Sequence, residues 1–98
     1  MTSRVLFRPQ ARAELLEAQA WYEKQAPGLG ADFALTVAAA TAGIGRFPHA
    51  HPAVHGNIRK AVLRRFPYAL LYVAEAESVV VLGCYHHRRD PEGWHSRS

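Results

Sequence analysis

The sequence predicts a small α+β domain in which a mostly antiparallel sheet carries a helical hairpin on one face. Three observations support this fold class: a short apolar run opens the chain, two segments with helical periodicity follow, and three strand-like runs fill the second half. The expected order is strand, helix, helix, strand, strand, strand. The 98 residues are expected to form a single domain over residues 1–98, with a tail that becomes partly irregular from about residue 88.

The first half of the chain predicts one strand and two helices. Consecutive apolar residues indicate a strand over Ser3–Arg8. Pro9 follows, and a proline fits the first turn of a helix, which is expected over Gln10–Gln25. Pro27–Gly30 ends this helix, and apolar residues at helical spacing predict a second helix over about Ala31–Arg46. Residues on the apolar stripe of the second helix are expected to lie in the core: Phe33, Val37 and Ile44.

The second half predicts a loop and three strands. The loop covers Pro48–Gly56, and the interleaved basic positions of Asn57–Arg64 favour an edge strand. Pro67–Ala74 and Ser78–Tyr85 flank a hairpin turn and are apolar on both faces, so both faces must be covered. We expect the helices to cover one face, and the tail, a bound partner, or both to cover the other. Strict alternation in the last strand gives two faces, Val79, Val81, Gly83 and Tyr85 against Val80, Leu82 and Cys84.

Basic residues and histidines gather in the second half of the chain. The net charge is +4 with a pI of about 9.7, and residues 50–98 hold seven of the 12 Lys and Arg residues and five of the six His. A sheet with such a rim suits a polyanion, which makes RNA or DNA machinery the expected target. The chain opens without an apolar signal segment and has no apolar run long enough for a membrane span, which predicts a cytoplasmic protein without membrane contact.

Neither the cysteine nor the histidines of the loop predict a reactive or metal site. Cys84 is the single cysteine, so no internal disulfide can form, and its place in an apolar strand favours a buried thiol. His49, His51 and His55 lie close together in the predicted loop, but their spacing matches no known ligand pattern. No metal and no cofactor are therefore expected.

Several groups of residues resemble the RelE/ParE family of toxins from type II toxin–antitoxin systems. The resemblance runs from about Val5 to Trp94 and is carried by the order and spacing of short motifs. These motifs are Trp21-Tyr22-Glu23, Pro27-Gly28-Leu29-Gly30 with Phe33, Ile58-Arg59-Lys60-Ala61, Arg64-Arg65-Phe66-Pro67-Tyr68-Ala69-Leu70-Leu71-Tyr72, and His86-His87-Arg88-Arg89-Asp90-Pro91 with Trp94.

The resemblance implies a growth-inhibiting toxin that a co-encoded antitoxin protein holds silent. RelE-like toxins enter the ribosomal A site and cleave mRNA without a metal, whereas ParE-like toxins poison DNA gyrase and catalyse no reaction. Our leading hypothesis is ribosome-dependent mRNA cleavage by a metal-independent endoribonuclease. The first alternative is a non-enzymatic gyrase poison. The second is an inactive module that binds only the antitoxin or a nucleic acid.

Cleavage of RNA without a metal needs a base, an acid and cations that stabilise the phosphate. His86 is expected to do the acid–base work, because it stands where some ribonucleases of the family carry a catalytic histidine. Arg65 is expected to stabilise the phosphate, and Lys60 to bind substrate or act as an alternative base. Neighbouring strands lie about 4.8 Å apart, so these three side chains could meet at one phosphate. Further substrate-binding candidates are Arg59, Arg64, His87, Arg88 and Arg89.

Overall fold

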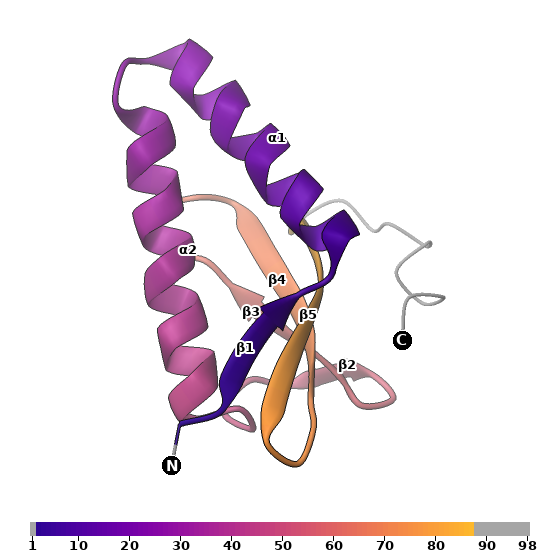
Figure 1. Cartoon of the computed structure of the whole chain (residues 1–98). Helices are drawn as coiled ribbons and strands as arrows, with labels where there is room; N and C mark the ends of the chain where they lie inside the picture. The colour runs from indigo at the N-terminus through magenta and orange to yellow at the C-terminus, as the bar shows by residue number, and fades with distance from the viewer. Residues whose placement is uncertain (1, 88–98) are drawn as a thin grey trace.

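The computed structural model describes residues 2–87 and confirms the predicted fold class (Figure 1). The predicted irregular tail, with Arg88 and Arg89, lies outside the described residues. The elements follow the predicted order, with one additional strand. They are β1 (Arg4–Phe7), α1 (Pro9–Gln25), α2 (Leu29–Arg46), β2 (Ala53–His55), β3 (Ile58–Val62), β4 (Tyr68–Ala74) and β5 (Ser78–His86).

The five described strands form one sheet in the order β1-β5-β4-β3-β2. β1 runs parallel to β5, with Arg4 opposite Ser78, and the other neighbouring pairs are antiparallel. The helical hairpin is therefore part of the crossover that brings the first strand beside the last. This crossover places the start of α1 close to β5 and not at a distant edge of the sheet.

The additional strand β2 lies where the sequence predicts only a loop, so that prediction is wrong for Ala53–His55. All three residues are exposed, and β2 is paired with β3 through backbone groups, with the Lys60 amide donating to the Pro52 carbonyl (3.2 Å). A strand without a buried side chain has no apolar alternation for a sequence pattern to detect. β3 is consequently covered by β2 over part of its length and is not the edge that the sequence predicts.

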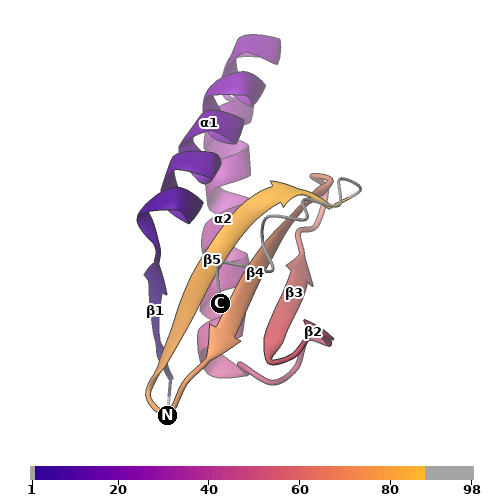
Figure 2. The same ribbon diagram turned by 90° about the vertical axis from the view of Figure 1, so that its right-hand side faces the viewer.

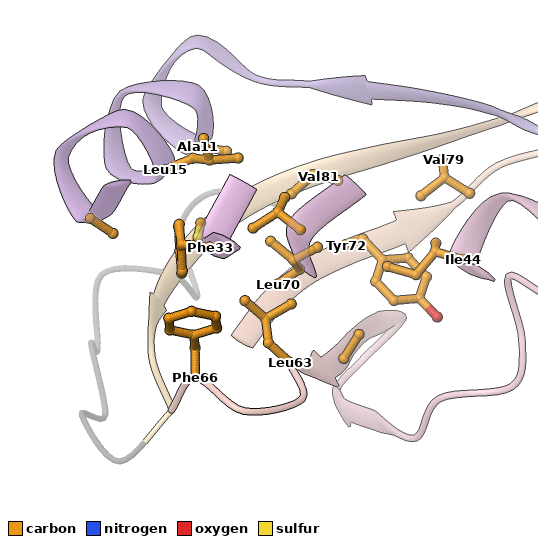
Figure 3. Close-up of a cluster of buried hydrophobic side chains, with 14 residues drawn as sticks. Ala11, Leu15, Phe33, Ile44, Leu63, Phe66, Leu70, Tyr72, Val79 and Val81 are labelled. Atoms are coloured by element: carbon orange, nitrogen blue, oxygen red, sulfur yellow. The ribbon is translucent and has the colours of Figure 1, made fainter. Parts of the chain in front are cut away.

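Both helices pack on one face of the sheet and enclose the main core with it (Figures 2 and 3). α1 contributes Ala11 and Leu15, and α2 contributes Phe33, Val37 and Ile44, which are at most 4% exposed. The core positions predicted on the second helix are confirmed. The sheet supplies Ala61, Leu70, Tyr72, Val79, Val81 and Cys84 to this core, and the turn between β3 and β4 adds Leu63 and Phe66.

A second apolar cluster lies on the other face of the sheet. It consists of Ile58, Leu71, Val73 and Leu82, with Val80 and Tyr85 packed against it, and it includes no residue of α1 or α2. β4 and β5 thus bury side chains on both faces, as their sequences predict.

A bulge in β5 changes which of its side chains face the helices. Leu71 lies opposite Gly83 and Tyr72 opposite Val81, so Leu82 is an extra residue without a partner of its own. Beyond this point the alternation is reversed, because an extra residue moves every later side chain to the other face. Cys84 joins Val79 and Val81 in the main core, which corrects the strict alternation expected from the sequence.

The turn between the helices is held by a carboxylate. Gly28 has a φ of 87°, a left-handed conformation that favours glycine. Glu23 near the end of α1 accepts hydrogen bonds from the amides of Gly28 (3.1 Å) and Gly30 (3.0 Å) at the start of α2. A negative charge is favourable near the positive, N-terminal end of the α2 dipole. Glu23 therefore caps α2, because Gly28 at the N-cap position has no side chain that could bond to the first amides of the helix.

Candidate functional site

A groove of about 590 Å³ lies between α1 and the adjoining ends of β4 and β5. Glu14, Glu17 and Trp21 reach it from α1, where their spacing of three and four residues places them on one side of the helix. Trp21 is 54% exposed. The complete lining is Glu14, Glu17, Ala18, Trp21, Tyr22, Pro67, Tyr68, Cys84, Tyr85 and His86. The groove therefore combines carboxylates with aromatic rings.

Glu14 fixes α1 to the bulged part of β5. Its Oε1 atom accepts a hydrogen bond from the backbone amide of Cys84 (3.0 Å), two residues past the extra residue of the bulge. The Cys84 thiol is buried, and burial, with a smaller contribution from Glu14, raises its pKa to about 12. The thiol is therefore protonated at neutral pH, and the prediction of a buried thiol is confirmed.

A cluster of aromatic rings lies next to the groove, and two of its residues, Tyr22 and Tyr68, line the groove. The Tyr22 ring stacks on Phe33 with ring centroids 5.2 Å apart, and it meets Phe66 edge to face at 4.8 Å. Tyr68 packs against both Tyr22 and Phe33. Burial, and secondarily Tyr68, raises the pKa of Tyr22. Rings in contact at such distances stabilise one another and hold the groove wall rigid.

His86 lies at the end of the groove on the helix side of the sheet. It pairs with Tyr68 across the β4–β5 ladder, and the two rings meet with centroids 5.7 Å apart. The His87 ring is parallel to that of His86 at 6.0 Å, and the His87 amide donates to the Pro67 carbonyl (2.9 Å). The end of β5 is thus fastened to the start of β4.

Arg65 occupies a strained turn between β3 and β4. Its φ is 71°, and the Phe66 amide donates to the Arg64 carbonyl (2.7 Å), which makes Arg65 the central residue of a γ-turn with positive φ. The guanidinium bonds to the Asp32 carboxylate of α2 (3.0 Å) and lies 5.2 Å from the centroid of the Phe66 ring. Non-glycine residues rarely adopt this backbone conformation, and such strain concentrates at functional positions.

Lys60 and Arg59 make contacts that fasten the chain. Lys60 is opposite Leu71 in the sheet, which places it on the face away from the helices, where its Nζ atom donates to the His87 carbonyl (3.2 Å). Arg59 lies on the helix face and donates to the carbonyls of His51 (2.6 Å) and His49 (3.3 Å). Both side chains therefore have structural partners.

The same loop is tied to the core by Tyr72, whose hydroxyl donates to the Pro48 carbonyl (2.8 Å). Burial is the main cause that raises the pKa of Tyr72.

Within residues 2–87, no three His, Cys, Asp or Glu side chains gather as metal ligands. No described helix is long and apolar enough to cross a membrane.

The three candidate catalytic residues lie in three different surroundings. His86 is in the groove on the helix face, Lys60 is on the opposite face, and Arg65 is paired with Asp32 at the start of α2. Lys60 does come together with His87, through the carbonyl of that residue. Arg64 is exposed. Arg88 and Arg89 lie outside the part of the chain that the structure describes.

Sequence reasoning missed the acidic side of the groove. Glu14 and Glu17 both line the groove, although no prediction from the sequence includes them. The spacing of Glu14, Glu17 and Trp21 along one helix side is a signal that could have grouped them. Nothing local indicates that β4 and β5 end opposite this side of α1.

One comparison with known proteins identifies a family. The family model of the ParE toxin of the type II toxin–antitoxin system parDE matches residues 5–91. The chain is also similar to a solved structure of the chromosomal ParDE TA system from P. aeruginosa, with a TM-score of 0.76 and 12% sequence identity. That match covers 87% of this chain and 96% of the other, and at such low identity it shows the fold alone. No curated protein matches the chain.

Proposed function

Because the chain belongs to the ParE toxins of type II toxin–antitoxin systems, we propose that it arrests growth by binding and poisoning DNA gyrase. The family model, which covers residues 5–91, is the observation that carries this proposal, and it confirms the resemblance seen in the sequence. We also propose that a cognate antitoxin binds the toxin and prevents it from arresting growth. The leading hypothesis from the sequence, cleavage of ribosome-bound mRNA, becomes the alternative that experiments must exclude.

The placement of the candidate catalytic residues supports a binding function. An acid, a base and a phosphate-stabilising cation must lie within hydrogen-bond reach of one substrate group. Here Lys60 and His86 are on opposite faces of the sheet, and the β5 bulge is the cause, because it moves His86 to the helix side. A toxin that binds its target without catalysing a reaction does not need these groups to converge.

The strained turn supplies the cations that we assign to target binding. Arg64 is exposed there, and the Arg65 side chain remains 59% exposed despite its ion pair with Asp32. A glycine would fit the positive φ of residue 65 without strain, so the arginine occupies this position at an energetic cost. In the proposal, Arg64 and Arg65 contact acidic groups of the target.

Replacing Arg65 by glycine tests this role apart from stability. We expect Arg65→Gly to change the melting temperature little, because relief of about 1 kcal/mol of strain offsets the loss of an exposed ion pair and of the contact with the Phe66 ring. Growth inhibition should nevertheless fall by roughly tenfold in potency, the loss expected for one charged contact. Induction titration in cells and a thermal melt give the two readouts.

Lys24→Ala is the matched control, since it also removes one exposed cation, near the end of α1 and outside the strained turn. It should inhibit growth like the parent. Full toxicity of Arg65→Gly, or an equal loss in both variants, would contradict a specific role for Arg65.

Induction of the toxin without its antitoxin tests the proposed function in cells. We expect growth arrest with chromosomal DNA breaks and an SOS response, and rescue when the antitoxin is co-expressed. Cleaved transcripts without DNA damage would favour the mRNA hypothesis instead. Unimpaired growth would favour the inactive binding module.

A further inference from the structure

The groove beside α1 has a charge opposite to that of the protein around it. The chain carries 12 Lys and Arg residues against eight acidic ones, yet two carboxylates, Glu14 and Glu17, line this groove. Glu14 is held by the Cys84 amide. Glu17 is exposed, and no ion pair joins it to another residue in the range 2–87. Glu17 is therefore positioned to pair with a cation from outside the described chain.

The aromatic residues of the groove indicate what kind of cation fits. Trp21, 54% exposed, stands one helical turn from Glu17, and Tyr22 and Tyr68 also line the groove. An indole face attracts a guanidinium or ammonium group, and the apolar stem of an arginine or lysine packs well on such rings. A carboxylate at the end of that stem adds a charge-assisted hydrogen bond. The groove thus suits an arginine or lysine side chain rather than a metal ion or an acidic group.

We propose that the groove receives an arginine or lysine side chain of the antitoxin, and that Glu17 makes the toxin select this partner. The inference rests on the proposed toxin function. Charge complementarity to the two groove carboxylates supports a basic side chain as the occupant, and the family assigns an antitoxin as the protein whose binding segment would carry it. A single basic side chain within such a segment would bind the acidic groove and fix the register of the whole segment.

The test measures binding of the antitoxin encoded by the neighbouring reading frame to the toxin and to two variants. Glu17→Gln should raise Kd on the order of tenfold and weaken its dependence on salt, because one charge pair is lost. Glu77→Gln is the matched control: it removes one exposed carboxylate at the β4–β5 turn, at the opposite end of this hairpin from His86, and should bind as the parent does. Thermal melts check that both variants are folded.

A charge exchange gives a readout that a purely structural role of Glu17 would not produce. Each Arg and Lys of the antitoxin is changed to glutamate in turn and tested against Glu17→Arg toxin. One of these antitoxins should recover binding to Glu17→Arg and bind the parent toxin poorly.

Four outcomes would overturn the inference. Unchanged antitoxin binding by Glu17→Gln, or the absence of any rescuing charge exchange, would do so while the proposed function stands. Loss of gyrase inhibition by Glu17→Gln with unchanged antitoxin binding would assign the groove to the target instead. Failure of the parent toxin to bind the antitoxin at all would overturn both the inference and the antitoxin part of the proposed function.

Discussion

Replacing Phe33 by alanine is expected to lower the free energy of unfolding by about 3–5 kcal/mol. Phe33 is fully buried and touches Tyr22, Phe66 and Tyr68, so its removal leaves a cavity that joins α1, α2 and the sheet. Small domains are stable by only about 5–15 kcal/mol in total, so this single change should cost much of the stability. Urea denaturation followed by circular dichroism measures the loss.

Leu35→Ala is the control on the same helix. Leu35 is 69% exposed, and truncation of an exposed side chain should change stability by about 0.5 kcal/mol or less. Equal losses for Phe33→Ala and Leu35→Ala would mean that the stripe on α2 does not face the core as the structure shows.

A methyl group added at Gly30 should destabilise the helical hairpin by roughly 1–3 kcal/mol. Its Cβ would come within 2.8 Å of the Gln19 carbonyl oxygen and 3.0 Å of the Glu23 Cβ atom, and backbone on α1 cannot move aside easily. The clash would also disturb the bonds by which Glu23 caps α2. Thermal and urea denaturation of Gly30→Ala provide the measurement.

Gly43→Ala, on the same helix, is expected to have the opposite effect on stability. Nothing lies within 4 Å of a Cβ at Gly43, so alanine should stabilise α2 by roughly 0.5–1 kcal/mol. The pair therefore predicts a change of sign between two chemically identical substitutions. If both variants gained stability, the close approach of the two helices at Gly30 would be disproved.

The sequence predicts those parts of the fold that repeat with a clear period. Phe33, Val37 and Ile44 mark the core side of α2, and the apolar runs of β4 and β5 mark strands buried on both faces. β2 could not be predicted, because its three exposed residues are held by backbone pairing that leaves no pattern in the side chains. Local sequence therefore specifies buried elements better than exposed ones.

The candidate site depends on features that no local pattern reveals. Without a bulge, strict alternation would place His86 on the same face as Leu82, which is also the face of Lys60. The extra residue in β5 moves His86 to the helix face and into the groove. The groove itself forms only where α1 meets the ends of two strands, so Glu14 and Glu17 gain their position from tertiary structure.

Supercoiling of relaxed plasmid by purified DNA gyrase, in the presence of the purified toxin, tests the central proposal most directly. We predict that the toxin stops supercoiling and leaves cleaved DNA bound to gyrase, while mRNA on programmed ribosomes stays intact in a parallel reaction. Normal supercoiling together with cleavage of the ribosome-bound mRNA would contradict the proposal and identify the toxin as a ribonuclease.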